Sequence, residues 1–408
     1  MYKKNIRSFR PSGNFRGGRS RGPGGSGDNR GGRHMRTVPK NVILSVIERS
    51  QTRAESVIFE PEAITHTFAD FALDPRLADA ITEKGFLTPT PIQDKAIPAI
   101  LAGKDLIGTA NTGTGKTAAF LIPLIHKMSQ NRNERALVIA PTRELAVQIN
   151  QEFRDLARRV GLRSTMLIGG ANEWRQRQDL RNTPNLVVAT PGRLKDFIGA
   201  GFIRLSDFAN VVLDEADRMV DIGFISEIKY FISLLPEKRQ SLFFSATISG
   251  KVGEILRDFV KNPVHVSVKK EDTATTIRQE AVRITRDVPK IEVLHDLLNK
   301  KEFDKVLIFG RTKWGVQKLS DELERRGFRA SAIHGNKRQN QRQFVLEQFK
   351  RSQIQVLLAT DVASRGLDIP DVSHVINYDL PETLEDYIHR IGRTGRANKR
   401  GIALTFIE

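Results

Sequence analysis

From about residue 66 onward, short apolar runs alternate with stretches of helical spacing. The apolar runs predict two series of strands: 105–108, 136–140, 165–168, 186–189, 211–213, 241–244 and 264–268, then 279–284, 306–309, 330–333, 356–359, 374–377 and 402–406. Continuous apolar strands separated by helices are typical of parallel sheets covered on both faces. The polar stretch 269–277 predicts a linker. We therefore expect an α/β fold with two tandem domains, 66–268 and 278–408.

The segments before residue 66 differ from the rest of the chain. Residues 1–36 are rich in arginine and glycine and hold ten basic side chains against a single acid. This composition buries too little apolar surface to offset the entropy of ordering, so we expect a disordered tail. Two Arg-Gly-Gly units, with Phe9 and Phe15 nearby, favour RNA binding, and a purely solubilising tail is the alternative. Residues 37–65 predict a linker or extension, in which 42–48 form a short helix or strand.

The formal net charge of +18 predicts attraction to polyanions such as nucleic acid or acidic membrane surfaces. The absence of cysteine excludes disulfides and cysteine-ligated metals, and it fits a reducing compartment. No apolar run reaches the roughly 18 residues of a membrane helix, and no apolar region follows the basic N-terminus as in a secretory signal. We therefore expect a cytoplasmic protein without membrane contact. Because the chain stops right after its last predicted strand, we also expect that a helix capping this strand is missing.

A candidate phosphate-binding loop follows the strand predicted at 105–108. Residues 110–117 read Ala-Asn-Thr-Gly-Thr-Gly-Lys-Thr and lead into a helical stretch. Glycines let backbone N–H groups turn toward phosphates, and the helix start adds a favourable dipole. We expect Lys116 to reach the β- and γ-phosphates and Thr117 to hold Mg²⁺. The generic pattern has glycine at position 110, where this chain has alanine. The predicted nucleotide-binding residues of the loop are Thr112, Gly113, Thr114, Gly115, Lys116 and Thr117.

Three acids stand directly after the strand predicted at 211–213. Carboxylates at the carboxyl end of a strand, in a sheet that carries a phosphate loop, suit the positioning of a metal ion and of water. We expect Asp214 to hold Mg²⁺ through its waters and Glu215 to orient and deprotonate the attacking water. An acidic tetrapeptide alone is usually a solvated turn or helix start, so the neighbouring loop is what favours catalysis.

Together these residues resemble the DEAD-box RNA helicase family, whose name is spelled by residues 214–217, Asp-Glu-Ala-Asp. The resemblance extends from about residue 68 to residue 406 and includes motifs of both domains in the family's order. It implies two RecA-like domains, ATP as the nucleotide and RNA as the polymer. Residues 85–93 resemble the Q motif, which implies that Gln93 reads the adenine edge and that Phe68 stacks on the base. Core packing is the alternative for Phe68.

Other motifs of the first domain resemble the family's RNA-facing and coupling stretches. Glycine backbone, helix starts, hydroxyls and guanidinium groups bind phosphate oxygens without reading bases. The resemblance assigns this backbone contact to Arg143, Gly170, Thr190 and Arg193. Residues 245–247 resemble the coupling motif, which implies that Ser245 and Thr247 link the acidic site, through Asp217, to the second domain.

In the second domain the resemblance implies RNA contact by Gln339, Arg342 and Thr360. It implies that Asp368 holds the ribose of ATP and that His389 contacts the coupling network. Residues 389–396 resemble the arginine-finger motif, in which Arg393 and Arg396 meet the γ-phosphate. A basic face for the RNA backbone is the alternative for this arginine run.

The predicted function is RNA-stimulated ATP hydrolysis coupled to local unwinding or remodelling of RNA. The predicted catalytic residues are Lys116, Asp214, Glu215, Arg393 and Arg396. The expected cofactors are ATP and Mg²⁺. The expected partner is RNA, as single strands or short duplexes, bound to a monomer that also meets ribonucleoprotein partners. Three alternatives stay open: a DNA-directed helicase or translocase, an ATP-gated RNA clamp or scaffold, and a phosphoryl-transfer enzyme for a small molecule.

Overall fold

The structure is a computed structural model that describes residues 37–53, 63–111, 113–248, 250–268, 277–364, 369, 372–395 and 401–408. The predicted tail 1–36, Thr112, nearly all of the predicted linker 269–277, Asp368 and Arg396 lie outside the described residues. Among the helices within these ranges, none combines the length and the apolar character needed to cross a membrane.

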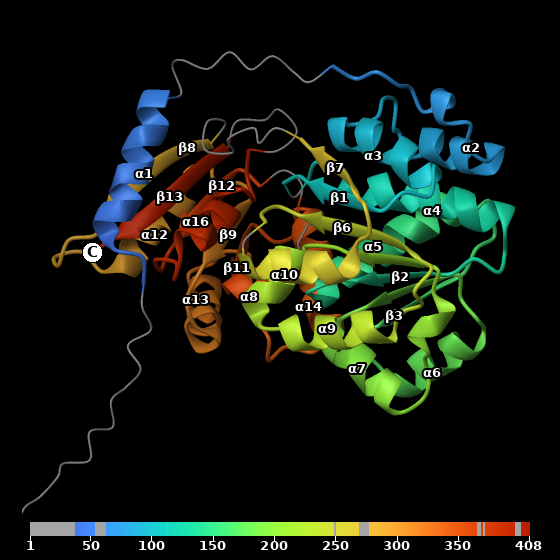
Figure 1. Cartoon of the computed structure of the whole chain (residues 1–408). Coiled ribbons are helices and arrows are strands. Elements are labelled where there is room, and N and C mark those ends of the chain that lie inside the picture. Colours follow the sequence, from blue (N-terminus) through green and yellow to red (C-terminus); the bar gives the residue numbers. More distant parts are fainter. Residues whose placement is uncertain are drawn as a thin grey trace, which may run out of the picture. The chain divides into compact units, whose positions relative to one another are not determined.

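The first predicted series of strands forms one parallel sheet (Figure 1). Its strands are β1 (Leu106–Thr109), β2 (Ala136–Ile139), β3 (Ser164–Leu167), β4 (Leu186–Ala189), β5 (Asn210–Leu213), β6 (Gln240–Ser245) and β7 (Val264–Ser267). They pair in the order β3-β4-β2-β5-β6-β1-β7. The helices of this part are η1 (Ala69–Phe71), α2 (Pro75–Glu83), α3 (Pro91–Leu101), α4 (Lys116–Gln130), α5 (Arg143–Ala157), α6 (Glu173–Arg181), α7 (Pro191–Gly199), η2 (Leu205–Asp207), α8 (Ala216–Ile222), α9 (Ile225–Leu234) and α10 (Gly250–Phe259).

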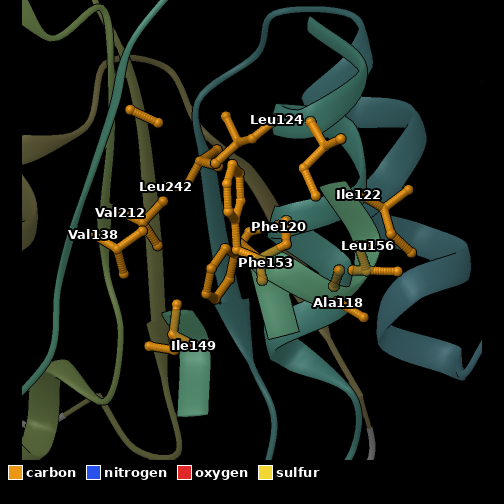
Figure 2. Packing of buried hydrophobic residues seen from close by; sticks show 14 of the residues in the cluster. Ala118, Phe120, Ile122, Leu124, Val138, Ile149, Phe153, Leu156, Val212 and Leu242 are labelled. Carbon is orange, nitrogen blue, oxygen red and sulfur yellow. The ribbon is translucent and has the colours of Figure 1, made fainter. Parts of the chain in front are cut away.

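Both faces of this sheet are buried, which is why its strands read as continuous apolar runs. Successive side chains along a strand point to opposite faces. Val138 belongs to one hydrophobic cluster, together with Phe120 of α4 and Phe153 of α5 (Figure 2). Its neighbour Leu137 belongs to another cluster, with Phe243. The prediction that both faces of the first sheet are covered is therefore confirmed.

The second predicted series forms a separate parallel sheet, paired in the order β10-β11-β9-β12-β13-β8. Its strands are β8 (Ile277–Arg283), β9 (Val306–Phe309), β10 (Ala330–Ile333), β11 (Val356–Ala359), β12 (His374–Asn377) and β13 (Gly401–Ile407). The helices of this part are α12 (Lys290–Leu298), α13 (Lys313–Arg325), α14 (Gln339–Lys350), α15 (Asp361–Ser364) and α16 (Leu384–Ile391). Alternate residues again fall in two clusters, with Ile308 in one and Leu307 in the other. The fold is α/β with two tandem RecA-like sheets, as predicted.

The N-terminal helix α1 (Lys40–Arg53) packs on the second sheet, although it precedes the first sheet in sequence (Figure 1). Ile43 is fully buried in a cluster with Ile277 of β8 and Ala403 of β13. The segment 42–48, predicted as either helix or strand, is helical. Its apolar residues are buried against strands that lie more than two hundred positions further along the chain.

Candidate functional site

The order of the strands brings three predicted motifs to one edge of the first sheet. Strand β6 lies between β5 and β1, and all three run parallel. Their carboxyl ends therefore meet at the same edge, where ligands bind in open α/β sheets. The phosphate loop follows β1, the acids 214–217 follow β5, and residues 245–247 end β6. A backbone hydrogen bond from Ala110 N–H to the Ser245 carbonyl (3.2 Å) ties the first and last of these together.

The described part of the phosphate loop has the backbone that the glycines predict. Gly113 and Gly115 have φ of 88° and 91°, which L side chains rarely adopt. A Cβ on Gly115 would also lie 2.5 Å from Gln93 Nε2, so both the conformation and the space require glycine there. Lys116 then begins α4. Its ammonium is buried and has no hydrogen-bond partner among the described residues, which fits an anionic ligand that is not part of the chain.

This lysine lines a cavity of about 770 Å³. The volume is in the range of small-molecule and cofactor sites. The walls include residues that follow β1 and β5 and carry hydroxyl, ammonium and carboxylate groups. Among the lining residues are Thr90, Gln93, Gly113, Gly115, Lys116, Thr117, Asp214 and Glu215. The cavity therefore brings together most of the predicted nucleotide-binding and catalytic residues of the first domain.

The acids after β5 are held in an unusual backbone. Glu215 has φ 49° and ψ 51°, a left-handed conformation that is strained for a residue with a side chain. Its N–H donates to Asp214 Oδ1 at 3.0 Å. Burial raises the pKa of Asp214 to about 7, with Lys116 acting in the opposite direction and Glu215 adding to the rise. A cation bound beside Asp214 would favour the ionised carboxylate.

The described residues contain no cluster of three or more acidic or histidine side chains arranged to hold a metal ion. A Mg²⁺ ion here would therefore take few protein ligands and complete its shell with water and phosphate oxygens, as Mg²⁺ commonly does. Thr117 and Asp214, both on the cavity wall, are the residues that fit this arrangement.

The predicted coupling residues form a connected network. Asp217 Oδ2 accepts hydrogen bonds from the N–H of Ala246 (3.0 Å) and of Thr247 (2.9 Å) and from the Thr247 hydroxyl (3.2 Å). The Asp217 N–H donates to Ser245 Oγ at 3.3 Å. The structure thus fastens Asp217, the third acid of the tetrapeptide, to the end of β6.

His389 lies in the electrostatic field of this network. Burial lowers its pKa to about 4, Arg393 acts in the same direction, and Asp217 opposes the shift. Arg393 is buried and its Nε–H donates to the His389 carbonyl at 3.3 Å. The other predicted finger, Arg396, and the predicted ribose ligand, Asp368, lie outside the described residues.

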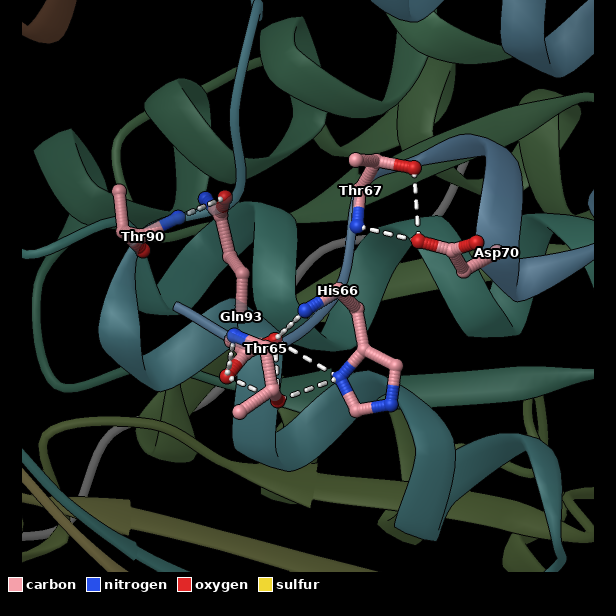
Figure 3. A network of polar contacts seen from close by, with 7 residues as sticks. Thr65, His66, Thr67, Asp70, Thr90 and Gln93 are labelled. Atoms are coloured by element: carbon pink, nitrogen blue, oxygen red, sulfur yellow. Dashed lines mark hydrogen bonds and ion pairs between the residues drawn. The ribbon is translucent and has the colours of Figure 1, made fainter. Parts of the chain in front are cut away.

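Gln93 is held by protein partners at both ends of its amide. Its Oε1 accepts from the Thr90 N–H (3.0 Å) and its Nε2 donates to the Gly115 carbonyl (3.2 Å), as Figure 3 shows for the Thr90 contact. The structure therefore ties the predicted adenine-reading residue to the phosphate loop. Phe68 stacks on Phe86 with ring centroids 6.5 Å apart, and it is Phe86 that lines the cavity.

Asp94, next to Gln93, anchors the segment that leads into η1 and carries Phe68. Its carboxylate accepts from the Thr65 and His66 backbone N–H groups and lies 2.8 Å from His66 Nδ1. Burial acts to raise the pKa of Asp94, but hydrogen bonds from His66 and Thr65 outweigh it and lower the pKa. Figure 3 shows the hydrogen bonds of Thr65 and His66 in this network. Asp94 is a positioning residue that sequence reasoning missed, because an acid in a first helical turn is usual.

The predicted RNA-facing residues of the first domain lie around α5, α6 and α7. Gly170 has φ 75°, and a Cβ there would lie 2.5 Å from Arg143 Nη1. The Arg143 guanidinium therefore packs directly on the glycine backbone, which leaves no space for a side chain. Thr190 is buried directly before α7. Arg193 Nη1 lies 2.8 Å from Glu173 Oε2.

The predicted RNA-binding residues of α14 are buried and paired with the first domain. Gln339 Nε2 donates to Glu144 Oε1 at 3.1 Å, and Arg342 Nη2 lies 3.0 Å from the same oxygen. Thr360, at the start of α15, is buried as well. Glu144 was not among the predicted residues. A buried acid in the first turn of α5 indicates a role for Glu144, but only the structure shows this burial. Nothing in the sequence indicates that its partners are Gln339 and Arg342.

Comparison with known proteins agrees with this architecture. Residues 90–255 match the family described as DEAD/DEAH box helicase, and residues 289–398 match the helicase conserved C-terminal domain. An ATP-dependent RNA helicase CshA from Listeria monocytogenes is 46% identical over 343 residues, which are 84% of this chain and 66% of the relative. A DEAD-box ATP-dependent RNA helicase CshA from Bacillus subtilis is 45% identical over 346 residues, 84% of this chain and 70% of the relative. The chain thus spans about two thirds of the length of these relatives.

Solved structures agree as well. The DEAD-box helicase Mss116 bound to single-stranded RNA and UDP-BeF is 30% identical, with a TM-score of 0.76 over 86% of this chain and 77% of that one. Saccharomyces cerevisiae Dbp5 bound to RNA and ADP BeF3 is 29% identical, with a TM-score of 0.75 over 84% of this chain and 90% of that one. The two family matches, on tandem RecA-like sheets with a phosphate loop and an adjoining acidic motif, assign the chain to the class of ATP-dependent helicases. The chain belongs to the DEAD-box family of ATP-dependent RNA helicases, in the group of CshA-like members.

Proposed function

We propose that this chain binds ATP with Mg²⁺, hydrolyses the ATP when single-stranded RNA is bound, and uses the cycle to open or remodel short RNA duplexes. The observation that carries the proposal is the buried, unpartnered ammonium of Lys116 on the wall of a cavity that also holds Thr117, Asp214 and Glu215. A cation enclosed in this way, at a helix start, suits the terminal phosphates of a nucleotide.

The side chains divide the work as follows. Lys116 neutralises the β- and γ-phosphates, and Thr117 and Asp214 would hold Mg²⁺, which would supply further charge neutralisation. Glu215 orients the attacking water and accepts its proton. The predicted fingers Arg393 and Arg396 stabilise the charge that develops on the transferred phosphoryl group, a contribution of about 10³–10⁵ in rate in enzymes of this type.

RNA recognition is proposed to run along the sugar–phosphate backbone. Arg143, Gly170, Thr190 and Arg193 serve the first domain, 66–268, and Gln339, Arg342 and Thr360 serve the second, 278–408. Contacts with 2′-hydroxyls provide the preference for RNA over DNA. Asp217, Ser245, Thr247 and His389 couple the two domains, and the basic tail 1–36 adds affinity that is sensitive to salt. The chain acts as a cytoplasmic monomer with ribonucleoprotein partners.

An ATP-gated RNA clamp is the second candidate function. The observation that favours it is the buried contact of Glu144 with Gln339 and Arg342, because a firm contact between the two domains suits long-lived holding of RNA. A clamp and a helicase share the ATP site and differ in whether duplexes open.

The test is steady-state ATP hydrolysis by the full chain with single-stranded RNA, with DNA of the same sequence, and with no nucleic acid. We expect strong stimulation by RNA alone, and loss of hydrolysis with retained ATP binding in Glu215→Gln. Equal stimulation by DNA would indicate a general nucleic-acid translocase. A strand-displacement assay then separates the two functions, since a clamp hydrolyses ATP with RNA but releases no strand.

A further inference from the structure

The two tryptophans of this chain are both on the surface. Trp174 is 66% exposed and Trp314 is 80% exposed. Tryptophan carries the largest apolar surface of any side chain and is usually well buried. Within the described part of the chain, neither indole ring packs against another aromatic ring. Each ring is therefore available to a planar ligand from solution.

Trp174 stands beside the predicted RNA contacts of the first domain. It is the second residue of α6, the helix that follows the Gly169-Gly170 turn against which Arg143 rests. The residue before it, Glu173, pairs with Arg193. Arg175, the residue after it, is exposed. The ring is thus placed among cations that the family resemblance assigns to the RNA backbone.

Trp314 has an equivalent place in the second domain. It is the second residue of α13, and Thr312 caps the start of this helix by accepting from the Gly315 N–H at 2.9 Å. Lys313 Nζ donates to Asn336 Oδ1 at 3.2 Å. Asn336 lies in the basic turn that leads directly into α14 and its predicted RNA-binding residues. This ring too is exposed beside cations, among them Lys313.

A continuous series of contacts joins the two positions. Arg143, next to the turn before Trp174, is followed in α5 by Glu144, which holds Gln339 of α14. The turn before α14 contacts the start of α13, where Trp314 lies. These contacts connect the residues beside Trp174 with the residues beside Trp314 through the predicted RNA-binding residues Arg143 and Gln339.

We propose that Trp174 and Trp314 are stacking platforms for unpaired bases of the RNA strand, one on each domain. The proposal rests on the proposed function and deepens it, because backbone contacts hold the phosphates but leave the bases without a partner. Base stacking on aromatic rings is tolerant of sequence, and a cationic surround suits the adjacent phosphates. Exposed Arg175 beside Trp174, and Lys313 beside Trp314, favour a nucleic acid over an apolar protein surface.

Intrinsic fluorescence tests the proposal directly. Trp314→Phe leaves Trp174 as the sole tryptophan, and Trp174→Phe leaves Trp314. A short single-stranded RNA, added with a non-hydrolysable ATP analogue, is expected to quench the fluorescence of each variant at saturation. A ribose–phosphate oligomer of the same length without bases is expected to leave it nearly unchanged. Equal signals from both oligomers, or no change with RNA that is demonstrably bound, would overturn the proposal.

Affinity provides the second readout. Trp174→Ala and Trp314→Ala are each expected to weaken binding of the RNA by about 5- to 150-fold, the range of base–aromatic stacking. Neither change should alter binding of the base-free oligomer. Tyr230→Ala is the matched control, because Tyr230 is a partly exposed aromatic residue of α9 that packs against Phe231. If the wild-type chain shows RNA-stimulated ATP hydrolysis while both alanine variants bind RNA normally, stacking is refuted and the proposed function stands. If the wild type binds no RNA, both are refuted.

Discussion

Glu144 of α5 and Arg342 of α14 form a buried ion pair, with Oε1 3.0 Å from Nη2, and the two residues belong to different sheets. Gln339 donates to the same carboxylate oxygen at 3.1 Å. Burial lowers the pKa of Arg342, and the Glu144 carboxylate acts in the opposite direction. A buried charge that loses its partner is costly, so the contact of Gln339 and Arg342 with the first domain depends on the Glu144 carboxylate.

Replacing this carboxylate should weaken the response to RNA. In Glu144→Ala we expect the affinity for RNA, measured with a non-hydrolysable ATP analogue, to fall by about tenfold or more, since truncating one partner of a buried charge pair typically costs about 2–5 kcal/mol. Asp155→Ala, in the same helix but paired with Lys84, should bind RNA normally. A double-mutant cycle with Arg342→Ala should show non-additive losses. Strictly additive losses would mean that the ion pair carries no coupling.

The left-handed backbone of Glu215 predicts that replacing this residue by glycine stabilises the fold but abolishes ATP hydrolysis. At φ 49° a side chain costs roughly 1 kcal/mol or more, which glycine avoids. Glu215→Gly should therefore be more stable to urea than Glu215→Ala by about 1 kcal/mol, although glycine is elsewhere the less stable residue. Both variants should fail to hydrolyse ATP.

Thr183 supplies the control for this comparison, because it also has a positive φ, 43°, and is exposed away from the cavity wall. Thr183→Gly should gain stability and keep full ATP hydrolysis. If Glu215→Gly were the less stable of the two Glu215 variants, the strain assigned to this position would be absent.

The strands and the motifs at their ends could be predicted from the sequence because each is a local pattern. A strand such as β2 or β9 is apolar at every position, since both faces of its sheet are covered. The loop after β1 and the acids after β5 then had to meet, because parallel strands share their carboxyl edge. The phosphate loop and the acidic motif support a common site because the strand order of the sheet places β1 and β5 close together, on either side of β6.

Other features depend on partners that are distant in sequence. Glu144 reads as an ordinary acid in a first helical turn, and only the fold shows that it meets Gln339 and Arg342. Residues 42–48 read as either a short helix or a strand, and only the fold shows that the helix to which they belong, α1, packs on β8. Sequence periodicity reports that a face is apolar but carries no information about which surface buries it.

The docking of α1 predicts that it stabilises the second domain. Ile43 is fully buried among Ile277, Ala403 and Tyr387, so Ile43→Ala should cost about 2–5 kcal/mol in the free energy of unfolding. Urea titration followed by circular dichroism measures this cost. Asn41→Ala changes an exposed residue of the same helix and should stay within about 0.5 kcal/mol of the wild type. Equal stability of both variants would show that α1 is not docked in solution.

His389 predicts how stability depends on pH in the nucleotide-free protein. Burial lowers the pKa of His389 from 6.5 to about 4, and Arg393, Arg218 and Lys116 push in the same direction against Asp217. Between these two pKa values the unfolded chain holds the proton and the folded chain does not. As the pH falls through this window, the free energy of unfolding therefore decreases by up to roughly 1.4 kcal/mol per pH unit. The full stabilisation from neutral His389 is present only above a pH of about 6.5.

His389→Gln removes the titrating group and should flatten this part of the profile. We expect the free energy of unfolding in urea, measured at several pH values between about 6.5 and about 4, to fall more steeply for the wild type than for the variant. Carboxylates contribute to the slope of both proteins, so the difference between the two curves is the quantity that reports on His389. His265→Gln, which removes a solvent-exposed histidine of β7, is the matched control. Parallel curves for the wild type and His389→Gln would mean that His389 accepts its proton in the folded state, and the half-buried position assigned to it beside Asp217 and Arg393 would then be wrong.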